Sequence, residues 1–446
     1  MIDEVALEEE FARTSLKRST LRRLAGYYRP HLKKVLLVVL LEAAWVASML
    51  VDPRLIRTAV DGPLRDGDVG GTLAIAGWMT LNVAVRALLT TWELRMGTYV
   101  GVQVIDALRR DVFDHIQRLS MRYFDRTKQG RIIARADRDV DTLEHLISWG
   151  PIMVTMLSLS LVLGTIVLVA SNAALAAWLV AAFPVVWLTT RIFHRLGFPA
   201  YRKVRETHSA ISTQVAEAVT GVRVVQAFGQ EGRELDELEH RQGRYRAAVI
   251  RGAKISAAYI PSLSATFHGV MVLILVFGGY AVVSGELTVG GLLEFVLLLG
   301  FVLGPVEGLG GLYNESLIAG AAAERIFLLL DTEPEVKDRA DAIDPGRLQG
   351  HIGFEKVSFA YDPQARNGWQ LEDVTFDVAP GQTVALVGHT GAGKTSVINL
   401  LARFYEAQHG IVRLDGHDIR DLTLDSLHKQ TGIVLQSNFL FAGSVL

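Results

Sequence analysis

Residues 383–401 read TVALVGHTGAGKTSVINLL: an apolar run, a glycine-rich loop and a second apolar run. The loop, Gly388–Thr395, fits the pattern G-x-x-x-x-G-K-[ST], in which glycines let backbone N–H groups close around phosphate oxygens. We expect 383–387 to form a strand and the residues from Lys394 onward to begin a helix, whose N-terminus adds partial positive charge. The stretch therefore predicts a phosphate site in a strand–loop–helix context.

Each residue of this loop has an expected part in the site. Lys394 would reach the β- and γ-phosphates of ATP, and the Thr395 hydroxyl would ligate Mg²⁺. ATP and Mg²⁺ are therefore the expected cofactors. The other candidate ATP-binding residues are Gly388, His389, Thr390, Gly391, Ala392, Gly393 and Ser396.

The residues on either side of this loop indicate further strands of a soluble α/β segment. We expect strands at 352–359, 371–378 and 432–435 from their apolar and β-branched content. Residues 411–415 loosely resemble an apolar strand that ends in a magnesium-binding aspartate. Arg413 interrupts this run and Gly416 follows it, so we interpret it as the end of a hairpin.

The chain before residue 331 differs in character, because long apolar runs alternate there with charged runs. A hydrocarbon core about 30 Å thick needs roughly 20 apolar residues in a helix. Six runs qualify, and burying so many in a soluble core is difficult. They lie near 35–56, 71–91, 146–170, 173–193, 259–284 and 287–308.

Lysine and arginine predict the orientation of these spans. They are abundant before the first span, between the second and third, and between the fourth and fifth, whereas the opposite loops are short. Six spans then predict that both termini lie in the cytoplasm. The expected location is the plasma or inner membrane. No short apolar run with a cleavage site begins the chain, so no signal peptide is expected.

Two long cytoplasmic segments continue the span helices by about 35–40 Å, at about 1.5 Å per residue. The first carries apolar residues at helical spacing. Each segment has a short break, near 123–130 and near 220–229. They could be plain solvated hairpins, but the nucleotide segment that follows favours levers whose turns touch it. The helix-period residues are Val104, Leu108, Val112, Ile116 and Leu119.

Composition supports a protein that is part membrane and part soluble. The chain has 446 residues, of which 50% are hydrophobic and 21% charged. Its net charge is −2 and its basic residues flank apolar runs, so no nucleic-acid partner is expected. It contains no cysteine, which excludes disulfides and thiolate chemistry.

Taken together, these features resemble the exporters of the ATP-binding cassette family, in which six spans are fused to a nucleotide-binding domain. The likeness covers essentially the whole chain. Besides the glycine-rich loop (the Walker A motif), the segments that carry it are 122–141 (RYFDRTKQGRIIARADRDVD), 217–228 (EAVTGVRVVQAF), 285–290 (GELTVG), 414–419 (LDGHDI) and 432–441 (GIVLQSNFLF).

The resemblance implies roles that the residues alone do not. On pattern alone, Tyr361 reads as an interface or core aromatic and Gln436 as a loop residue. By likeness, Tyr361 would stack on adenine, and Gln436 would meet Mg²⁺ and the γ-phosphate. Ser437 and Asn438 depart from the acidic residue usual after that glutamine. The segments 122–141 and 217–228 would surround the two coupling helices.

The resemblance also implies a fold class, a function and partners. We expect a multi-domain chain with an all-α polytopic membrane domain and a partial α/β P-loop domain organised around a parallel sheet. The function implied is ATP-dependent export of a lipid, drug or peptide-like substrate by a dimer with a second half-transporter, in a lipid bilayer. The expected divisions are 1–34 (cytoplasmic segment), 35–330 (spans), 331–350 (linker) and 351–446 (nucleotide-binding part).

Some family motifs are not found within the 446 residues. We find no L-S-G-G-Q signature, no apolar strand ending in Asp-Glu and no switch histidine, so the catalytic base is not among these residues. We expect this chain to insert its spans but to have a loosely folded nucleotide part and background ATPase activity. The alternative is an ATP-binding membrane protein, or a degenerate half-transporter, without productive hydrolysis.

Two charges inside the spans add a hypothesis, because such charges are often functional. Glu42 and Arg86 lie at similar expected depths, about 10 Å and 8 Å from the cytoplasmic ends of their spans. We expect them to pair or to face a shared watery cavity. The alternative is that each is solvated separately near the interface.

Overall fold

The computed structural model describes residues 18–362, 368–434, 439 and 441–443. It divides into two compact units, each of which is made of segments that are not contiguous in the sequence. The first unit combines Met1–Val35, Thr98–Gly150 and Tyr313–Leu446, and the second combines Leu36–Gly97 and Pro151–Leu312.

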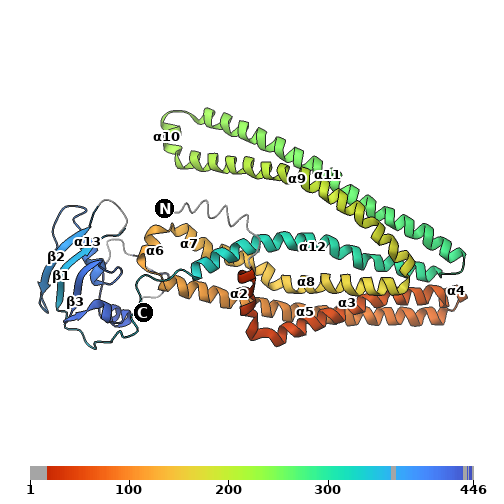
Figure 1. Ribbon diagram of the computed structural model, residues 1–446, viewed down its shortest axis with the longest axis horizontal. Coiled ribbons are helices and arrows are strands. Elements are labelled where there is room, and N and C mark those ends of the chain that lie inside the picture. The colour runs from red at the N-terminus through yellow and green to blue at the C-terminus, as the bar shows by residue number, and fades with distance from the viewer. Residues whose placement is uncertain (1–17, 363–367, 435–438, 440, 444–446) are drawn as a thin grey trace. The chain divides into compact units, whose positions relative to one another are not determined.

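Helices make up the chain from residue 18 to residue 330 (Figure 1). Short helices and breaks separate the long ones. In order they are α2 (Arg18–Tyr28), η1 (Arg29–His31), α3 (Leu32–Asp61), α4 (Pro63–Asp66), α5 (Val69–Arg118), α6 (Met121–Arg126), α7 (Gln129–Ala136), α8 (Arg138–Ser171), α9 (Ala173–Thr220), α10 (Val222–Ala227), α11 (Glu231–Val283) and α12 (Val289–Leu330).

The apolar runs expected to cross the membrane all lie in helices. Among the residues that the structure describes, five helical stretches are long and apolar enough to do so by length and composition, within Ser19–Asp66, Val69–Arg118, Gln129–Ser171, Ala173–Thr220 and Glu231–Val283. The sixth run lies in α12, where the apolar helical part that meets these criteria is shorter, Val289–Pro305. The helical membrane-type domain is therefore confirmed.

The long helices also continue past the expected spans. α5 runs from the expected span end at Thr91 to Arg118, and α9 runs from Phe193 to Thr220. Each extension is about 40 Å long at about 1.5 Å per residue. The breaks fall where expected: α6 and α7 follow α5, and α10 follows α9 and ends before Gly229, whose φ is 58°.

The helix-period residues of α5 form the core of the first unit. Val104, Leu108 and Val112 are almost completely buried, and Ile116 and Leu119 continue the same face. They belong to one cluster with residues of α7, α8 and α12, including Ile132, Val140, Leu143, Ala322 and Ile326. The period predicted from the sequence therefore marks the buried stripe of α5.

The second unit has a separate apolar core. It joins the end of α8, the start of α9, and parts of α11 and α12. Its buried members include Leu168, Leu175, Ile274, Phe295 and Leu298. Trp178 of α9 stacks on Phe277 of α11, with ring centroids 4.5 Å apart.

The nucleotide-binding part contains a four-stranded sheet in the order β2-β1-β3-β4. β1 (Ile352–Phe359) pairs antiparallel with β2 (Leu371–Val378) and with β3 (His409–Leu414), and β3 pairs antiparallel with β4 (His417–Asp418). The β3–β4 turn has positive φ at Asp415 and Gly416, as a tight hairpin requires. The hairpin expected at 411–415 is confirmed.

Two other expected strands are wrong for the described residues. Residues 383–387 and 432–434 form no strand, and within the described part of the chain no strand pairs with them. The described strands pair antiparallel, and 383–387, the segment expected to belong to the parallel sheet of a P-loop domain, pairs with none of them. An isolated extended segment has no ladder of hydrogen bonds to define it, and here Val387 remains 88% exposed.

A packed core nevertheless lies beneath the antiparallel sheet. α13 (Lys394–Leu401) contributes Val397 and Leu400, and α14 (Leu424–Lys429) contributes Leu427. They join Phe354 and Phe359 of β1 in one buried cluster. The helix that carries the phosphate loop is thus anchored, although the segment preceding the loop is exposed.

The expected contact between Glu42 and Arg86 is wrong. Arg86 Nη2 lies 2.6 Å from Asp52 Oδ2, and Asn82 Nδ2 donates to Asp52 Oδ1 at 2.7 Å. Buried Glu42 lies beside Glu93 instead. α3 and α5 run antiparallel, so residues later in α3 face residues earlier in α5. Asp52 therefore faces Asn82 and Arg86, whereas Glu42 faces Glu93. Depths counted from approximate span ends could not fix this register.

We therefore expect energetic coupling between Arg86 and Asp52. Both side chains are mostly shielded from solvent, so removing one partner leaves the other poorly compensated. A double-mutant cycle with Arg86→Gln and Asp52→Asn should give an interaction free energy of about 1–2 kcal/mol. The measurement is thermal stability of the purified chain in detergent.

The control cycle combines Arg86→Gln with Glu42→Gln. Its effects on stability should add, because these side chains face different partners. Coupling in the control cycle and additivity in the Asp52 cycle would contradict the observed register.

Candidate nucleotide-binding site

The phosphate loop lies between an extended segment and α13. Gly391 and Gly393 have φ of 87° and 83°, a region that favours glycine. A Cβ on Gly393 would lie 2.6 Å from Leu371 Cδ2 and 2.8 Å from the Gln370 carbonyl oxygen. Gly393 therefore serves both the turn and the close approach of the loop to β2.

Lys394 closes the loop on itself. Its Nζ donates to the carbonyl oxygens of Gly388 and His389, at 2.9 and 2.8 Å. Two further contacts lie within the loop: Ala392 N donates to the His389 carbonyl, and His389 Nδ1 lies 2.9 Å from the Thr390 carbonyl. The lysine ammonium is thus held over the curve of the loop, where a phosphate would be bound.

The first turn of α13 presents unused donors. Within the described part of the chain, the backbone N–H groups of Lys394, Thr395 and Ser396 make no hydrogen bond. Such N–H groups and the helix dipole together favour an anion. The exposed Thr395 hydroxyl is also free to ligate a cation held by that anion. The donor set therefore fits a phosphate group with Mg²⁺.

Tyr361 lies next to this turn. Its hydroxyl accepts hydrogen bonds from Asn399 Nδ2 at 3.0 Å and from Ser396 Oγ at 3.3 Å, both on α13. Gln408 holds the end of β1 through both the N–H and the carbonyl of Ala360. The aromatic expected to contact adenine is thus fixed beside the phosphate loop.

Tyr361 also belongs to an aromatic group that sequence reasoning missed. Its ring meets Tyr405 edge-on at 5.0 Å and Phe359 at 4.8 Å. The Tyr405 hydroxyl donates in turn to the Asp125 carboxylate of α6. Burial, and then the hydrogen bond to Asp125, raises the pKa of the Tyr405 phenol, which therefore stays a protonated donor.

Two ion pairs surround this contact. Arg126 of α6 lies 3.3 Å from Asp362, the residue after Tyr361, and Arg122 lies 3.0 Å from Glu335 of the linker. All of these residues belong to the first unit. The expected contact between the first cytoplasmic turn and the nucleotide part is therefore present. No spacing rule singles out Tyr405 or Asp125, since their meeting depends on the tertiary fold.

Two further residues, Gln436 and Asp415, bear on a metal site. Gln436, expected at Mg²⁺, lies outside the described residues. Asp415 accepts backbone N–H bonds from Gln349 and His351, at 2.6 and 2.7 Å. Burial would raise the pKa of Asp415, but the N–H donors outweigh it and the pKa is lowered. Asp415 therefore joins the β3–β4 turn to the segment before β1, and it lies at the end of a hairpin, as predicted from the sequence.

Comparison with known proteins shows the family. Residues 35–306 match the family described as ABC transporter transmembrane region, and residues 371–445 match the family described as ABC transporter. The chain is 31% identical over 431 residues to the uncharacterized ABC transporter ATP-binding protein YknV of Bacillus subtilis, covering 95% of this chain and 70% of that protein.

Two relatives have more specific names. A multidrug efflux ATP-binding/permease protein of Mycobacterium bovis is 31% identical, over 95% of this chain and 35% of that protein. An ATP-dependent lipid A-core flippase of Syntrophus aciditrophicus is 27% identical, over 95% of this chain and 70% of that protein. The two matched regions follow each other in the order transmembrane and then ABC transporter, and the glycine-rich loop before α13 lies in the second. The names of these relatives, both of which refer to ATP, agree with that loop. The chain belongs to the ABC transporter family, as an exporter-type half-transporter with an ATPase-type nucleotide-binding region.

Proposed function

We propose that this chain works as one half of a dimeric exporter, in which ATP and Mg²⁺ bound at the loop 388–396 drive alternating access of the spans. The observation that carries the proposal is the contact chain from Tyr361 through Tyr405 to Asp125 of α6. It joins the nucleotide site to a helix that interrupts the span extensions α5 and α8. Nucleotide state at one end can therefore bias the position of α6 at the other.

The proposed parts of the site are as follows. Lys394 and the N–H groups of the first α13 turn hold the β- and γ-phosphates, and Thr395 holds Mg²⁺ together with Gln436. Tyr361 stacks on adenine. Mg²⁺, when bound, neutralises charge between the β- and γ-phosphates. A second half-transporter supplies the groups that complete the site across the dimer.

Location and substrate class belong to the same proposal. The basic segments next to the spans support a cytoplasmic location for α6, α10 and both termini, with the six helices across the plasma or inner membrane. Contact of α10 with a nucleotide-binding domain is proposed by analogy with that of α6. The names of the multidrug and lipid A-core relatives support an amphipathic substrate.

Removing the Tyr405 hydroxyl should uncouple α6 from ATP. Tyr405→Phe keeps the aromatic contacts but removes the donor to Asp125. We expect ATP affinity to change less than about threefold, because the phosphate contacts remain. ATP-induced change in hydrogen exchange of the α6 peptide should fall to near zero. Hydrogen-exchange mass spectrometry of the full chain, with and without ATP and Mg²⁺, measures the exchange rates of α6 and of the spans in one experiment.

Tyr27→Phe provides a matched control, because Tyr27 also donates to an aspartate, Asp111 of α5 at 2.8 Å, and packs against the helical core of the first unit. It should leave the ATP response of α6 intact. A normal ATP response in Tyr405→Phe would exclude this route. If ATP changed exchange in no span helix of the unmodified chain, the proposal of ATP-driven alternating access would itself fail.

A further inference from the structure

A crevice of about 680 Å³ lies between α9 and α11, wholly within the second unit. Its volume falls in the range of small-ligand sites, roughly 300–1,000 Å³. Most of its lining is apolar, including Ile192, Leu196 and Ile255. Ile192, Leu196 and Ile250 are each about half exposed, which is costly in water. These residues therefore form an open apolar surface beside two helices expected to cross the membrane.

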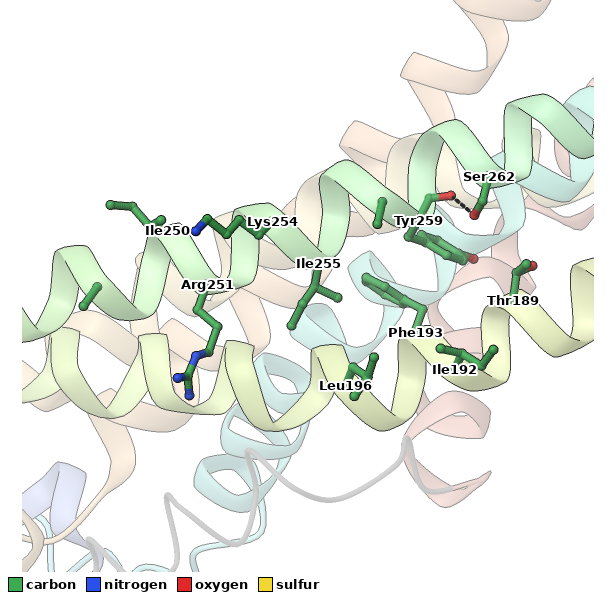
Figure 2. A pocket seen from close by; sticks show the side chains of 12 residues that line it. Thr189, Ile192, Phe193, Leu196, Ile250, Arg251, Lys254, Ile255, Tyr259 and Ser262 are labelled. Atoms are coloured by element: carbon green, nitrogen blue, oxygen red, sulfur yellow. Dashed lines mark hydrogen bonds between the residues drawn. The ribbon is translucent and has the colours of Figure 1, made fainter.

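An aromatic pair lines the crevice near one end. Phe193 of α9 and Tyr259 of α11 stack with centroids 4.1 Å apart and planes 17° apart. Figure 2 shows the two rings facing each other between the helices. The Tyr259 hydroxyl lies 3.3 Å from Thr190 Oγ1. Both aromatics mark expected span ends, where such rings commonly lie at the edge of the hydrocarbon core.

Two cations lie at the other end of the crevice. Arg251 and Lys254 line it from α11, and Figure 2 shows Arg251 directed toward α9. No acidic side chain forms an ion pair with either cation among the residues that the structure describes. Lys254 and Arg251 precede Tyr259 by about 8 and 12 Å along the helix, at about 1.5 Å per residue. The headgroup region beside the hydrocarbon is roughly 5–8 Å thick, and long cationic side chains can reach it.

We propose that this crevice binds an anionic phospholipid of the adjacent leaflet. Arg251 and Lys254 contact the phosphate, while an acyl chain covers Ile192, Leu196 and the Phe193–Tyr259 stack. Along α11, Arg251 and Lys254 lie farther from the expected span than Ile255 and Tyr259 of the same lining, as a headgroup phosphate lies farther from the bilayer centre than its acyl chains. A soluble anion would leave the apolar surface exposed, and a neutral lipid would leave both cations without a partner. This inference does not depend on ATP-driven transport.

The absence of cysteine allows a site-specific test. Ala258→Cys places an environment-sensitive fluorophore in the crevice of the full chain, and Ala257→Cys places one at the same depth outside the crevice lining. Each protein is reconstituted in phosphatidylcholine vesicles with an equal mole fraction of nitroxide-labelled phosphatidylglycerol or nitroxide-labelled phosphatidylcholine. No nucleotide is added. We expect phosphatidylglycerol to quench position 258 more than phosphatidylcholine does, with a much smaller preference at position 257.

Charge variants then test the two cations. Arg251→Gln with Lys254→Gln should lower the preference for phosphatidylglycerol at position 258 by about tenfold. Arg251→Lys with Lys254→Arg should retain it. Arg244→Gln with Arg246→Gln removes two exposed cations of α11 that lie outside this crevice, and it should also retain the preference.

Three results would overturn the proposal. Equal preference at positions 257 and 258 would indicate general attraction of lipid to a basic helix. Equal losses in the 251/254 and 244/246 variants would indicate the same. Shielding of position 258 from both lipids, increasing with the protein-to-lipid ratio, would show that a second copy of the chain covers the crevice.

Discussion

Lys394→Ala is expected to weaken ATP binding by about a hundredfold. The substitution removes the Lys394 ammonium group from the loop. It also removes the two hydrogen bonds that Nζ donates to the Gly388 and His389 carbonyls. Charge-assisted hydrogen bonds contribute about 1.5–3 kcal/mol, and about 2.7 kcal/mol corresponds to a hundredfold. Adding Tyr361→Ala removes the aromatic platform, so the double variant should show no measurable ATP photolabelling.

Lys429→Ala is the matched control for this substitution. Lys429 also lies in the nucleotide-binding part, but it is exposed and pairs with Asp425 one turn earlier on α14. ATP affinity should stay within about twofold of the unmodified chain. Photolabelling that survived the Lys394→Ala/Tyr361→Ala variant would show that the loop 388–396 is not the nucleotide site.

Arg403→Ala is expected to destabilise the nucleotide-binding part by about 3 kcal/mol. Arg403 is only 2% exposed and follows α13. Its guanidinium donates to the carbonyl oxygens of Leu422 and Lys337, at 2.7 and 3.1 Å, and to Glu406 at 3.2 Å. One side chain thus joins the linker, the end of the phosphate-loop helix and the segment before α14. Its removal leaves the buried Leu422 carbonyl without this donor.

The measurement is hydrogen exchange of β1 and α13 in the full chain, because it reports local opening without unfolding the spans. Arg413→Ala is the control: Arg413 also pairs with a glutamate, Glu355 at 2.7 Å, but both side chains are substantially exposed. The control should change the opening free energy by less than about 1 kcal/mol. Similar protection losses in the two variants would contradict a specific role for burial of Arg403.

The sequence alone determined the helical membrane-type domain, the glycine-rich turn that precedes α13 and the position of the helix breaks. Each of these depends on local or periodic information. Apolar length sets a span, glycine spacing sets a phosphate loop, and residues such as Leu108 recur at the helix period because one face is buried. Even the interpretation of Asp415 needed only its neighbours Arg413 and Gly416.

Tertiary structure decided which distant residues meet. Strand formation at 383–387 failed because a strand needs a partner, and apolar content alone does not supply one. Arg86 pairs with Asp52 because the register of two antiparallel helices, and not their depths along the chain, sets the facing pairs. Tyr405 reaches Asp125 across 280 positions of sequence, a contact that no local pattern encodes. Local chemistry made the phosphate loop predictable, but long-range packing connected that loop to α6.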